Sequence, residues 1–204
     1  MHQEIFNQNQ LKLLPFVAQF KKEFYLVGGT AIALYIGHRR SIDFDLFKFS
    51  QIKPKSIIKT ISGFGYPYTV TRRVTEQMNL TIYDVKFTFY QYPFKISETE
   101  MFNDILRLPK LIDLTAMKAY ALGRRSKWKD YVDFYFLLKE YFTIKQIAES
   151  ANEVYGQLFS EKLFRAQLTY FDDIDYTEQV EYICHPVAES DIKEFLIDIA
   201  TDIY

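Results

Sequence analysis

One stretch of this 204-residue chain, residues 24–47, constrains the fold most strongly. It opens with a short apolar run typical of a buried strand, which stops at Gly28-Gly29. A short helix follows, opened by Thr30. Residues 42–49 then alternate between apolar and polar side chains, which predicts a second strand. Strand, glycine turn, helix and strand in so short a span predict an α/β fold.

The glycine turn has the chemistry of an anion site. Glycine lets a ligand approach the backbone closely, because it has no Cβ. The N-terminus of the following helix offers free N–H groups and the positive end of the helix dipole. Thr30 adds a hydroxyl donor. Together, residues 28–30 are predicted to bind the phosphates of a nucleotide.

Two carboxylates follow at a spacing that suits a metal ion. Asp43 and Asp45 are two residues apart on the second predicted strand, so both side chains lie on the same face. Carboxylate oxygens are the ligands that Mg²⁺ prefers. Alone, a glycine pair is usually a turn and two aspartates are usually a solvated sheet face. In this order and spacing they predict a phosphate loop and a metal pair meeting over one nucleoside triphosphate.

The rest of the chain divides near Pro93. Before it, helices are predicted over 10–22 and 52–62, and strand-like runs over 68–75 and 80–92. From about residue 98 onward the patterns are mainly helical, over 111–122, 131–141, 144–150, 161–167 and 190–203. We therefore expect a core domain over 1–95 and a helical region over 96–204.

The motif of residues 28–47 resembles the signature of the nucleotidyltransferase superfamily, a glycine turn followed by an Asp-x-Asp strand. It is most similar to the AbiEii/AbiGii toxin branch, which is related to the MenT toxins. That branch continues from Gly-Gly-Thr to His-Arg-x-Ser-x-Asp-x-Asp-Leu-Phe. The matching residues here are Gly28, Gly29, Thr30, His38, Arg39, Ser41, Asp43, Asp45, Leu46 and Phe47.

A second segment carries the same resemblance. The family has a helix with Lys, Ala-Leu and Arg, then a basic-Asp-x-x-Asp segment. The matching residues here are Lys118, Ala121, Leu122, Arg125, Lys129, Asp130 and Asp133. Lys118 and Arg125 are seven residues apart, so they share a helix face from which both can reach one triphosphate. Asp130 and Asp133 either hold Lys118 in place or take part in proton transfer. The structural alternative is an exposed basic helix joined to the next helix by ion pairs.

The sequence departs from the superfamily at one position. A third carboxylate is usual on a later strand, and Thr88 occupies its expected place. Asp84 is predicted on the same strand face, but about 13 Å away. Either the third carboxylate is dispensable, or Asp84 or another acid replaces it, or activity is reduced.

The resemblance implies an α/β nucleotidyltransferase core with a mixed sheet, a helical C-terminal region packed against it, and the nucleotide in the cleft between them. It implies Mg²⁺, or Mn²⁺, held by Asp43 and Asp45, with phosphates bound by the glycine turn, Arg39 and Ser41. The reaction is transfer of a nucleotidyl group from an NTP to an acceptor hydroxyl, such as the 3′ end of a tRNA. The context is a bacterial toxin–antitoxin or phage-defence system with a cognate antitoxin. Two alternatives to this reaction remain. The chain is either a nucleotide-binding module with weak or no catalysis, or a transferase that acts on a small molecule or a protein side chain.

Composition is compatible with this interpretation. A single cysteine, Cys184, excludes an internal disulfide framework and a cysteine zinc site. A polar N-terminus and the lack of a long apolar run predict a cytoplasmic chain without a signal peptide or membrane span. Residues 1–170 hold 24 Lys and Arg against 16 Asp and Glu, whereas residues 171–204 hold one Lys and ten acids. A basic body suits polyanionic ligands such as nucleotides or RNA. The many aromatic rings are expected mainly in the core, with a base-stacking surface as the alternative.

Overall fold

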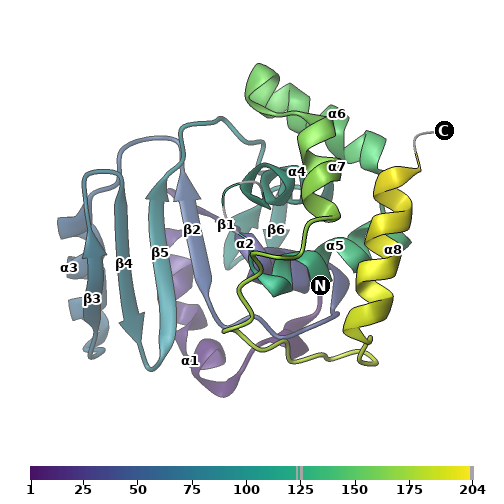
Figure 1. Ribbon diagram of the computed structural model, residues 1–204. Helices are drawn as coiled ribbons and strands as arrows, with labels where there is room; N and C mark the ends of the chain where they lie inside the picture. The colour runs from purple at the N-terminus through teal and green to yellow at the C-terminus, as the bar shows by residue number, and fades with distance from the viewer. Residues whose placement is uncertain (123, 125, 203–204) are drawn as a thin grey trace. The chain divides into compact units, whose positions relative to one another are not determined.

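The computed structural model describes residues 1–122, 124 and 126–202, and it divides into two compact units (Figure 1). The first unit is Met1–Lys110 and the second is Leu111–Tyr204. The boundary expected after residue 95 precedes two short strands, and both of these strands belong to the first unit. Each unit is described by itself below.

A seven-stranded mixed sheet forms the centre of the first unit, with the order β3-β4-β5-β2-β1-β7-β6 (Figure 1). The pairs β2–β5 and β1–β7 are parallel, and the other neighbours are antiparallel. This arrangement confirms the predicted α/β class. The strands are β1 Tyr25–Val27, β2 Phe44–Lys48, β3 Thr69–Arg73, β4 Gln77–Ile82, β5 Val85–Gln91, β6 Glu100–Phe102 and β7 Leu106–Leu108.

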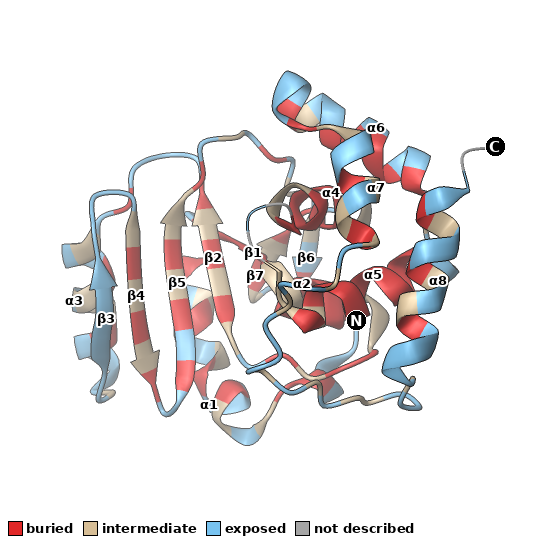
Figure 2. Ribbon diagram, in the orientation of Figure 1, coloured by how far each residue is buried: buried red, intermediate tan, exposed pale blue. Residues whose placement is uncertain are grey.

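Helices cover the apolar face of this sheet. They are α1 Gln8–Val17, α2 Gly28–Ile36 and α3 Pro54–Phe64, with 3-10 turns η1 Gln3–Ile5 and η2 Ala18–Phe20. Phe16 of α1 packs edge-on against Phe87 of β5, with ring centroids 5.6 Å apart, and Phe44 of β2 stacks on the same ring. Burial alternates along β2, β4 and β5 (Figure 2), so their second face is partly exposed and carries polar side chains together with the rings of Phe47 and Tyr90. That second face carries the candidate site.

One expectation in the first unit was wrong. The run over 80–92 is not one strand, because β4 and β5 form a hairpin whose two-residue turn is Tyr83-Asp84. Both turn residues have positive φ, at 49° and 63°, without the glycine that usually marks such a turn. The chain is mainly helical after residue 98, as expected, but its helices start only at Leu111, because β6 and β7 first form a second hairpin around Asn103-Asp104.

The second unit is helical, as predicted. Its elements are α4 Leu111–Leu122, α5 Trp128–Glu140, α6 Ile144–Tyr155, η3 Gly156–Leu158, α7 Glu161–Leu168 and α8 Glu189–Thr201. Ten of the thirteen residues of α5 are buried (Figure 2), and α4 packs against α5, α6 and α7. Within the described part of the chain, no helix combines the length and apolar character needed to cross a bilayer.

Candidate active site

The glycine turn and the acidic strand are in direct contact in the first unit. Strand β1 runs into α2, whose first residue, Gly28, has a φ of +73°. A Cβ at Gly28 would overlap Oδ2 of Asp45. A Cβ at Gly29 would lie 2.7 Å from Nη2 of Arg39 and 3.3 Å from Oγ of Ser41. Glycine is therefore required at position 28, where φ is positive and the Asp45 carboxylate occupies the space of a Cβ, whereas a Cβ at position 29 would displace the end of the Arg39 side chain.

Strand register brings the aspartates to this turn. Val27 at the end of β1 pairs with Asp45 of β2 in the antiparallel ladder, so Gly28 is the next residue past the pair. Asp43 lies one residue before β2 begins, and its Oδ1 is buried without a hydrogen-bond partner among the described residues. The α2 N-terminus has no capping side chain, so its first N–H groups suit an anion.

Hydroxyl groups brace the backbone of the acidic segment. The Thr30 hydroxyl donates to the main-chain oxygen of Asp43, and it lies 2.9 Å from the Ser41 hydroxyl. Gln10 of α1, which is completely buried, donates from Nε2 to the Ser41 carbonyl at 2.9 Å. Thr30 and Ser41, expected to contact phosphate, thus also fix the position of Asp43. Sequence reasoning missed Gln10, whose one signal is its capping box with Asn7.

A buried cation adjoins the same turn. Arg39 is 2% exposed, and its Nη1 donates to the Arg40 carbonyl at 2.9 Å while Nη2 faces Gly29. His38 is equally buried. A guanidinium held this firmly next to the helix N-terminus increases the positive potential where the triphosphate is expected.

The register also locates the position of the missing third carboxylate. Thr88 of β5 pairs directly with Asp45, and Asn79 of β4 pairs with Thr88 on its other side. Arg72 of β3 pairs with Asn79. These four paired residues form one row across β2, β5, β4 and β3, which begins at the acidic Asp45 and ends at the basic Arg72. Asp84 is not on this row, because it lies in the exposed β4–β5 turn. Its predicted place on the strand face was wrong.

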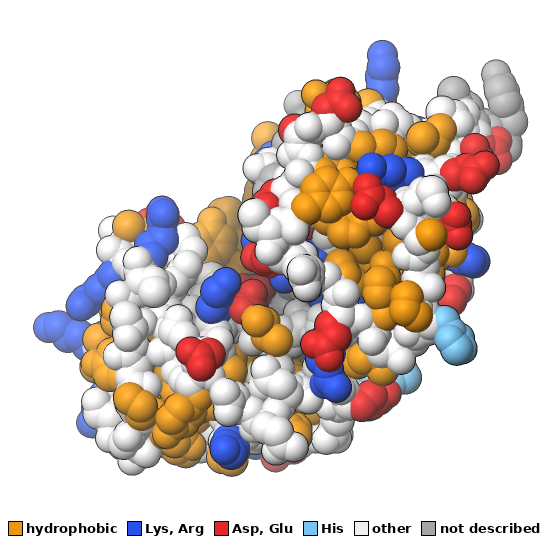
Figure 3. Space-filling model, turned by 60° about the horizontal axis from the view of Figure 1, so that its bottom comes forward, with side chains coloured by type: hydrophobic (Ala, Val, Ile, Leu, Met, Phe, Trp, Pro, Cys, Tyr) orange, Lys and Arg blue, Asp and Glu red, His pale blue; other side chains and the backbone are white. Residues whose placement is uncertain are grey.

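Basic side chains gather at the sheet edge where this row ends. Figure 3 shows Lys and Arg at the edge of β3 and α3. The exposed basic residues of these two elements are Lys55, Lys59, Arg72 and Arg73. This edge contributes to the basic character predicted for the body of the chain.

In the second unit, the predicted lysine and its two aspartates form a buried cluster. Nζ of Lys118 lies 2.5 Å from Oδ1 of Asp130 and 2.8 Å from Oδ2 of Asp133. The three side chains are 4%, 6% and 0% exposed, respectively. The alternative was an exposed basic helix joined to the next helix by ion pairs. Its first part is wrong for Lys118, whose charge is enclosed, and its second part is confirmed by the two ion pairs to α5. Arg125 lies outside the described residues.

The next basic residues pair with the acidic end of the chain. Glu178 accepts from Nζ of Lys127 at 2.6 Å and also pairs with Lys129. Burial opposes ionisation of Glu178, but hydrogen bonds from the two lysines outweigh it and lower its pKa to about 2. Part of the charge asymmetry of the sequence is thus neutralised by ion pairs within the second unit.

The donor set fits a magnesium ion. Asp43 offers a buried oxygen that has no protein partner among the described residues, and the Asp45 carboxylate lies against the glycine turn. Two carboxylates, with phosphate and water oxygens completing the shell, are a usual Mg²⁺ arrangement. In the described ranges no group of three or more His, Cys, Asp and Glu is arranged to hold a metal.

Comparisons with known proteins agree with these motifs. Residues 16–95 match the family model described as "Nucleotidyl transferase AbiEii toxin, Type IV TA system". An uncharacterized protein of Aquifex aeolicus is 29% identical over 185 residues, which cover 85% of this chain and 88% of that protein. The family match confirms the predicted resemblance.

Two solved structures share the fold. The nucleotidyltransferase toxin MenT4 of Mycobacterium tuberculosis superposes with a TM-score of 0.63 at 14% identity, covering 96% of this chain and 82% of that one. JHP933 of Helicobacter pylori superposes with a TM-score of 0.57 at 16% identity, covering 98% and 91%. The expected nucleotidyltransferase-type fold is therefore confirmed.

Proposed function

Because residues 16–95 of this chain carry the AbiEii nucleotidyltransferase toxin domain, we propose a specific reaction for it. The protein transfers a nucleotidyl group from an NTP to a hydroxyl at the 3′ end of an RNA, with tRNA as the acceptor class. It does so with Mg²⁺, as the toxin of a toxin–antitoxin or phage-defence system, and a cognate antitoxin restrains it.

One observation supports the proposal above all. The carboxylate of Asp45 occupies the space beside Gly28, at the uncapped N-terminus of α2. An anion site and a cation site in contact suit a ligand that carries both, a metal-bound triphosphate. A glycine turn alone, or a pair of surface aspartates alone, would not require this contact.

The candidate site residues of the first unit have separate roles in this reaction. Asp43 and Asp45 hold the metal, which neutralises the triphosphate and polarises the α-phosphate when bound. The N–H groups of the glycine turn and the guanidinium of Arg39 bind the β- and γ-phosphates. The Thr30 hydroxyl holds the Asp43 backbone, which helps to position this metal ligand before the nucleotide binds.

Lys118 supplies positive charge in the second unit. In its buried cluster it is oriented by Asp130 and Asp133, whose ion pairs limit its rotation. Such a held cation stabilises the negative charge that develops on the leaving pyrophosphate. We assign Arg125 the same task, and we assign Asp130 and Asp133 the task of holding Lys118 in place.

A label-transfer assay tests the reaction. The purified chain is incubated with each α-labelled NTP, Mg²⁺ and total RNA, and labelled RNA is resolved on a gel. Asp43→Asn and Asp45→Asn should abolish labelling, because each removes a metal ligand. Asp84→Asn is the matched control, since it makes the same chemical change in the exposed hairpin turn and should leave labelling intact. Labelling that survives Asp43→Asn would refute the assignment.

A binding module without catalysis is the second candidate, and Thr88 favours it. A threonine opposite Asp45 cannot accept a proton from an attacking hydroxyl as a carboxylate can. This candidate predicts nucleotide binding that depends on Asp43, without transfer to RNA, protein or small molecules. Mass spectrometry of the labelled product identifies the acceptor and separates RNA from a protein or a metabolite.

A further inference from the structure

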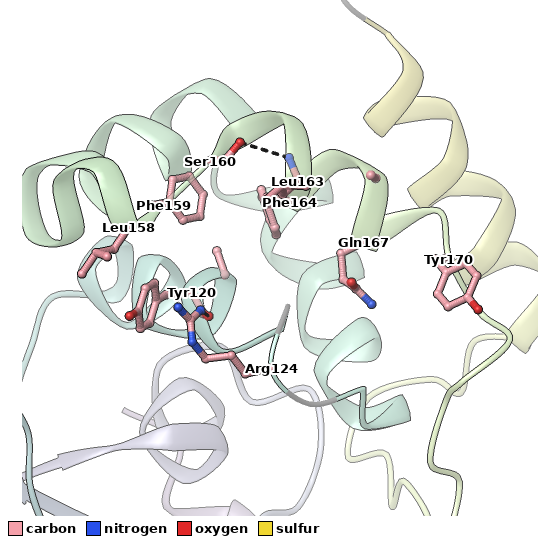
Figure 4. Close-up of a pocket in the computed structure, with 11 residues that line it drawn as sticks. Tyr120, Arg124, Leu158, Phe159, Ser160, Leu163, Phe164, Gln167 and Tyr170 are labelled. Carbon is pink, nitrogen blue, oxygen red and sulfur yellow. Dashed lines mark hydrogen bonds between the residues drawn. The ribbon is translucent and has the colours of Figure 1, made fainter.

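The second unit contains a cavity of about 580 Å³ that the proposed reaction does not use. It lies between the end of α4, the turn η3 and helix α7 (Figure 4). Its walls are largely aromatic and aliphatic, with one cation and one amide. The residues that carry the argument are Tyr120, Arg124, Phe159, Leu163, Gln167 and Tyr170.

A stacked column presents the cation at this cavity. The ring of Tyr120 stacks on Tyr155 with centroids 3.9 Å apart and an angle of 7°. The Arg124 guanidinium lies 3.6 Å above the Tyr120 ring, and its Nη1 donates to the Tyr120 carbonyl at 2.5 Å. Figure 4 shows the Arg124 and Tyr120 side chains together at the cavity. No carboxylate among the described residues forms an ion pair with Arg124, so its charge is available to an anionic ligand.

Apolar surface surrounds the same space. Leu163 is 70% exposed and Tyr170 is 48% exposed, whereas Phe159 is buried. Contiguous exposed apolar surface around a cavity is typical of a ligand-binding or interaction site. Gln167 lines the cavity with an amide whose Nε2 makes, among the described residues, two long bonds of 3.4 Å, to Ser126 and Tyr131. Its amide can therefore pair with the edge of a planar polar ligand.

We propose that this cavity binds one nucleotide of a single-stranded RNA acceptor. The base lies between the apolar walls, its edge pairs with Gln167, and its phosphate binds Arg124. The volume falls within the range of about 300–1,000 Å³ usual for small-ligand sites. Stacking on aromatic rings and on guanidinium planes is how proteins bind unpaired bases. The inference rests on the proposed function, because it names how that reaction would recognise its acceptor.

Binding of a fluorescein-labelled, 12-nucleotide single-stranded RNA to the full chain tests this site. Arg124→Ala and Tyr170→Ala should each weaken RNA binding about tenfold, since each removes a phosphate or stacking contact. Arg124→Ala should also reduce the dependence of affinity on salt. Lys145→Ala and Tyr141→Ala are the matched controls, because both residues are exposed in the same unit away from the cavity. The controls should stay within twofold.

Two further readouts separate this inference from the proposed function. Binding of a non-hydrolysable ATP analogue with Mg²⁺ should be unchanged in the cavity variants and lost in Asp43→Asn. RNA containing 4-thiouridine should crosslink to peptides from residues 155–170. Transfer to RNA with unaltered affinity in both cavity variants would overturn the inference and leave the reaction standing, with the cavity assigned to a protein partner. Cavity-dependent RNA binding without any transfer would refute the reaction alone.

Discussion

Replacing Gly28 by alanine tests the contact on which the proposed site depends. Its φ of +73° is unfavourable for any residue with a Cβ, at a cost of about 1–2 kcal/mol. The new methyl group would also overlap Oδ2 of Asp45. The Asp45 side chain must therefore turn away from the glycine turn, or the start of α2 must shift. Either movement separates the anion site from the metal ligand.

Gly65→Ala is a matched control for this change. Gly65 has a φ of +67°, nearly that of Gly28, but a Cβ there meets nothing within 4 Å. It follows the last residue of helix α3, so alanine there also adopts a positive φ, but without displacing a side chain. The difference between the two losses in free energy of unfolding, measured in urea, therefore includes the overlap with Asp45. We expect a difference of about 1–3 kcal/mol, as for other overpacked sites.

The two variants should differ far more in activity than in stability. A misplacement of about 1 Å in a catalytic constellation costs about 100-fold. Gly28→Ala should therefore lose at least that factor in nucleotidyl transfer at a temperature where both variants are folded, and Gly65→Ala should retain transfer within twofold. Transfer by Gly28→Ala at the Gly65→Ala level would refute the view that Asp45 and the turn act together.

Three other changes have outcomes that follow from the structure. Thr88→Asp places a carboxylate beside Asp45, and it should tighten Mn²⁺ binding and raise the rate of transfer, both measurable in the purified chain. Lys118→Met leaves two buried carboxylates without their cation, so unfolding in urea should show a loss of about 3–5 kcal/mol, part of which a second change, Asp133→Asn, restores. Glu178 has a folded pKa near 2, below its ordinary 4.5, so it stabilises the protein above pH 4.5 and this contribution declines as the pH falls toward 2. Glu178→Gln should remove about 1–2 kcal/mol at pH 7 and flatten the stability curve between pH 4.5 and 2, whereas an unchanged curve would exclude the lysine pairs as its source.

The local part of the candidate site could be predicted from the sequence. A strand, two glycines, a helix and an alternating strand with Asp43 and Asp45 are each encoded by neighbouring residues, so spacing and periodicity suffice. Helices 111–122 and 161–167 were predicted within one residue for the same reason. The pairing of Thr88 with Asp45 agrees with the position that the family resemblance indicated.

Contacts distant in sequence could not be predicted. Gln10 reaches the Ser41 carbonyl across 31 residues, and nothing in its own segment indicates that partner.

Two tight turns were also difficult to predict. The Tyr83-Asp84 turn has both residues at positive φ, a conformation that tyrosine rarely adopts, and no glycine marks it. The sequence therefore predicts one continuous strand there. The strands around Asn103-Asp104 are three residues long, too short for an alternating pattern, although that dipeptide is itself a turn signal.

The threonine opposite Asp45 has the largest consequence for the chemistry. A hydroxyl does not accept a proton near neutral pH, so the proton of an attacking hydroxyl must pass to solvent, to a phosphate oxygen or to one of the two aspartates. With one carboxylate fewer, the site also carries less negative charge against a triphosphate and a polyanionic acceptor. Binding of both substrates is then easier while proton transfer is slower. In Thr88→Asp these two effects should separate, with weaker RNA binding at low salt and faster transfer at saturation. If both quantities moved in the same direction, position 88 would act on the reaction only through substrate affinity.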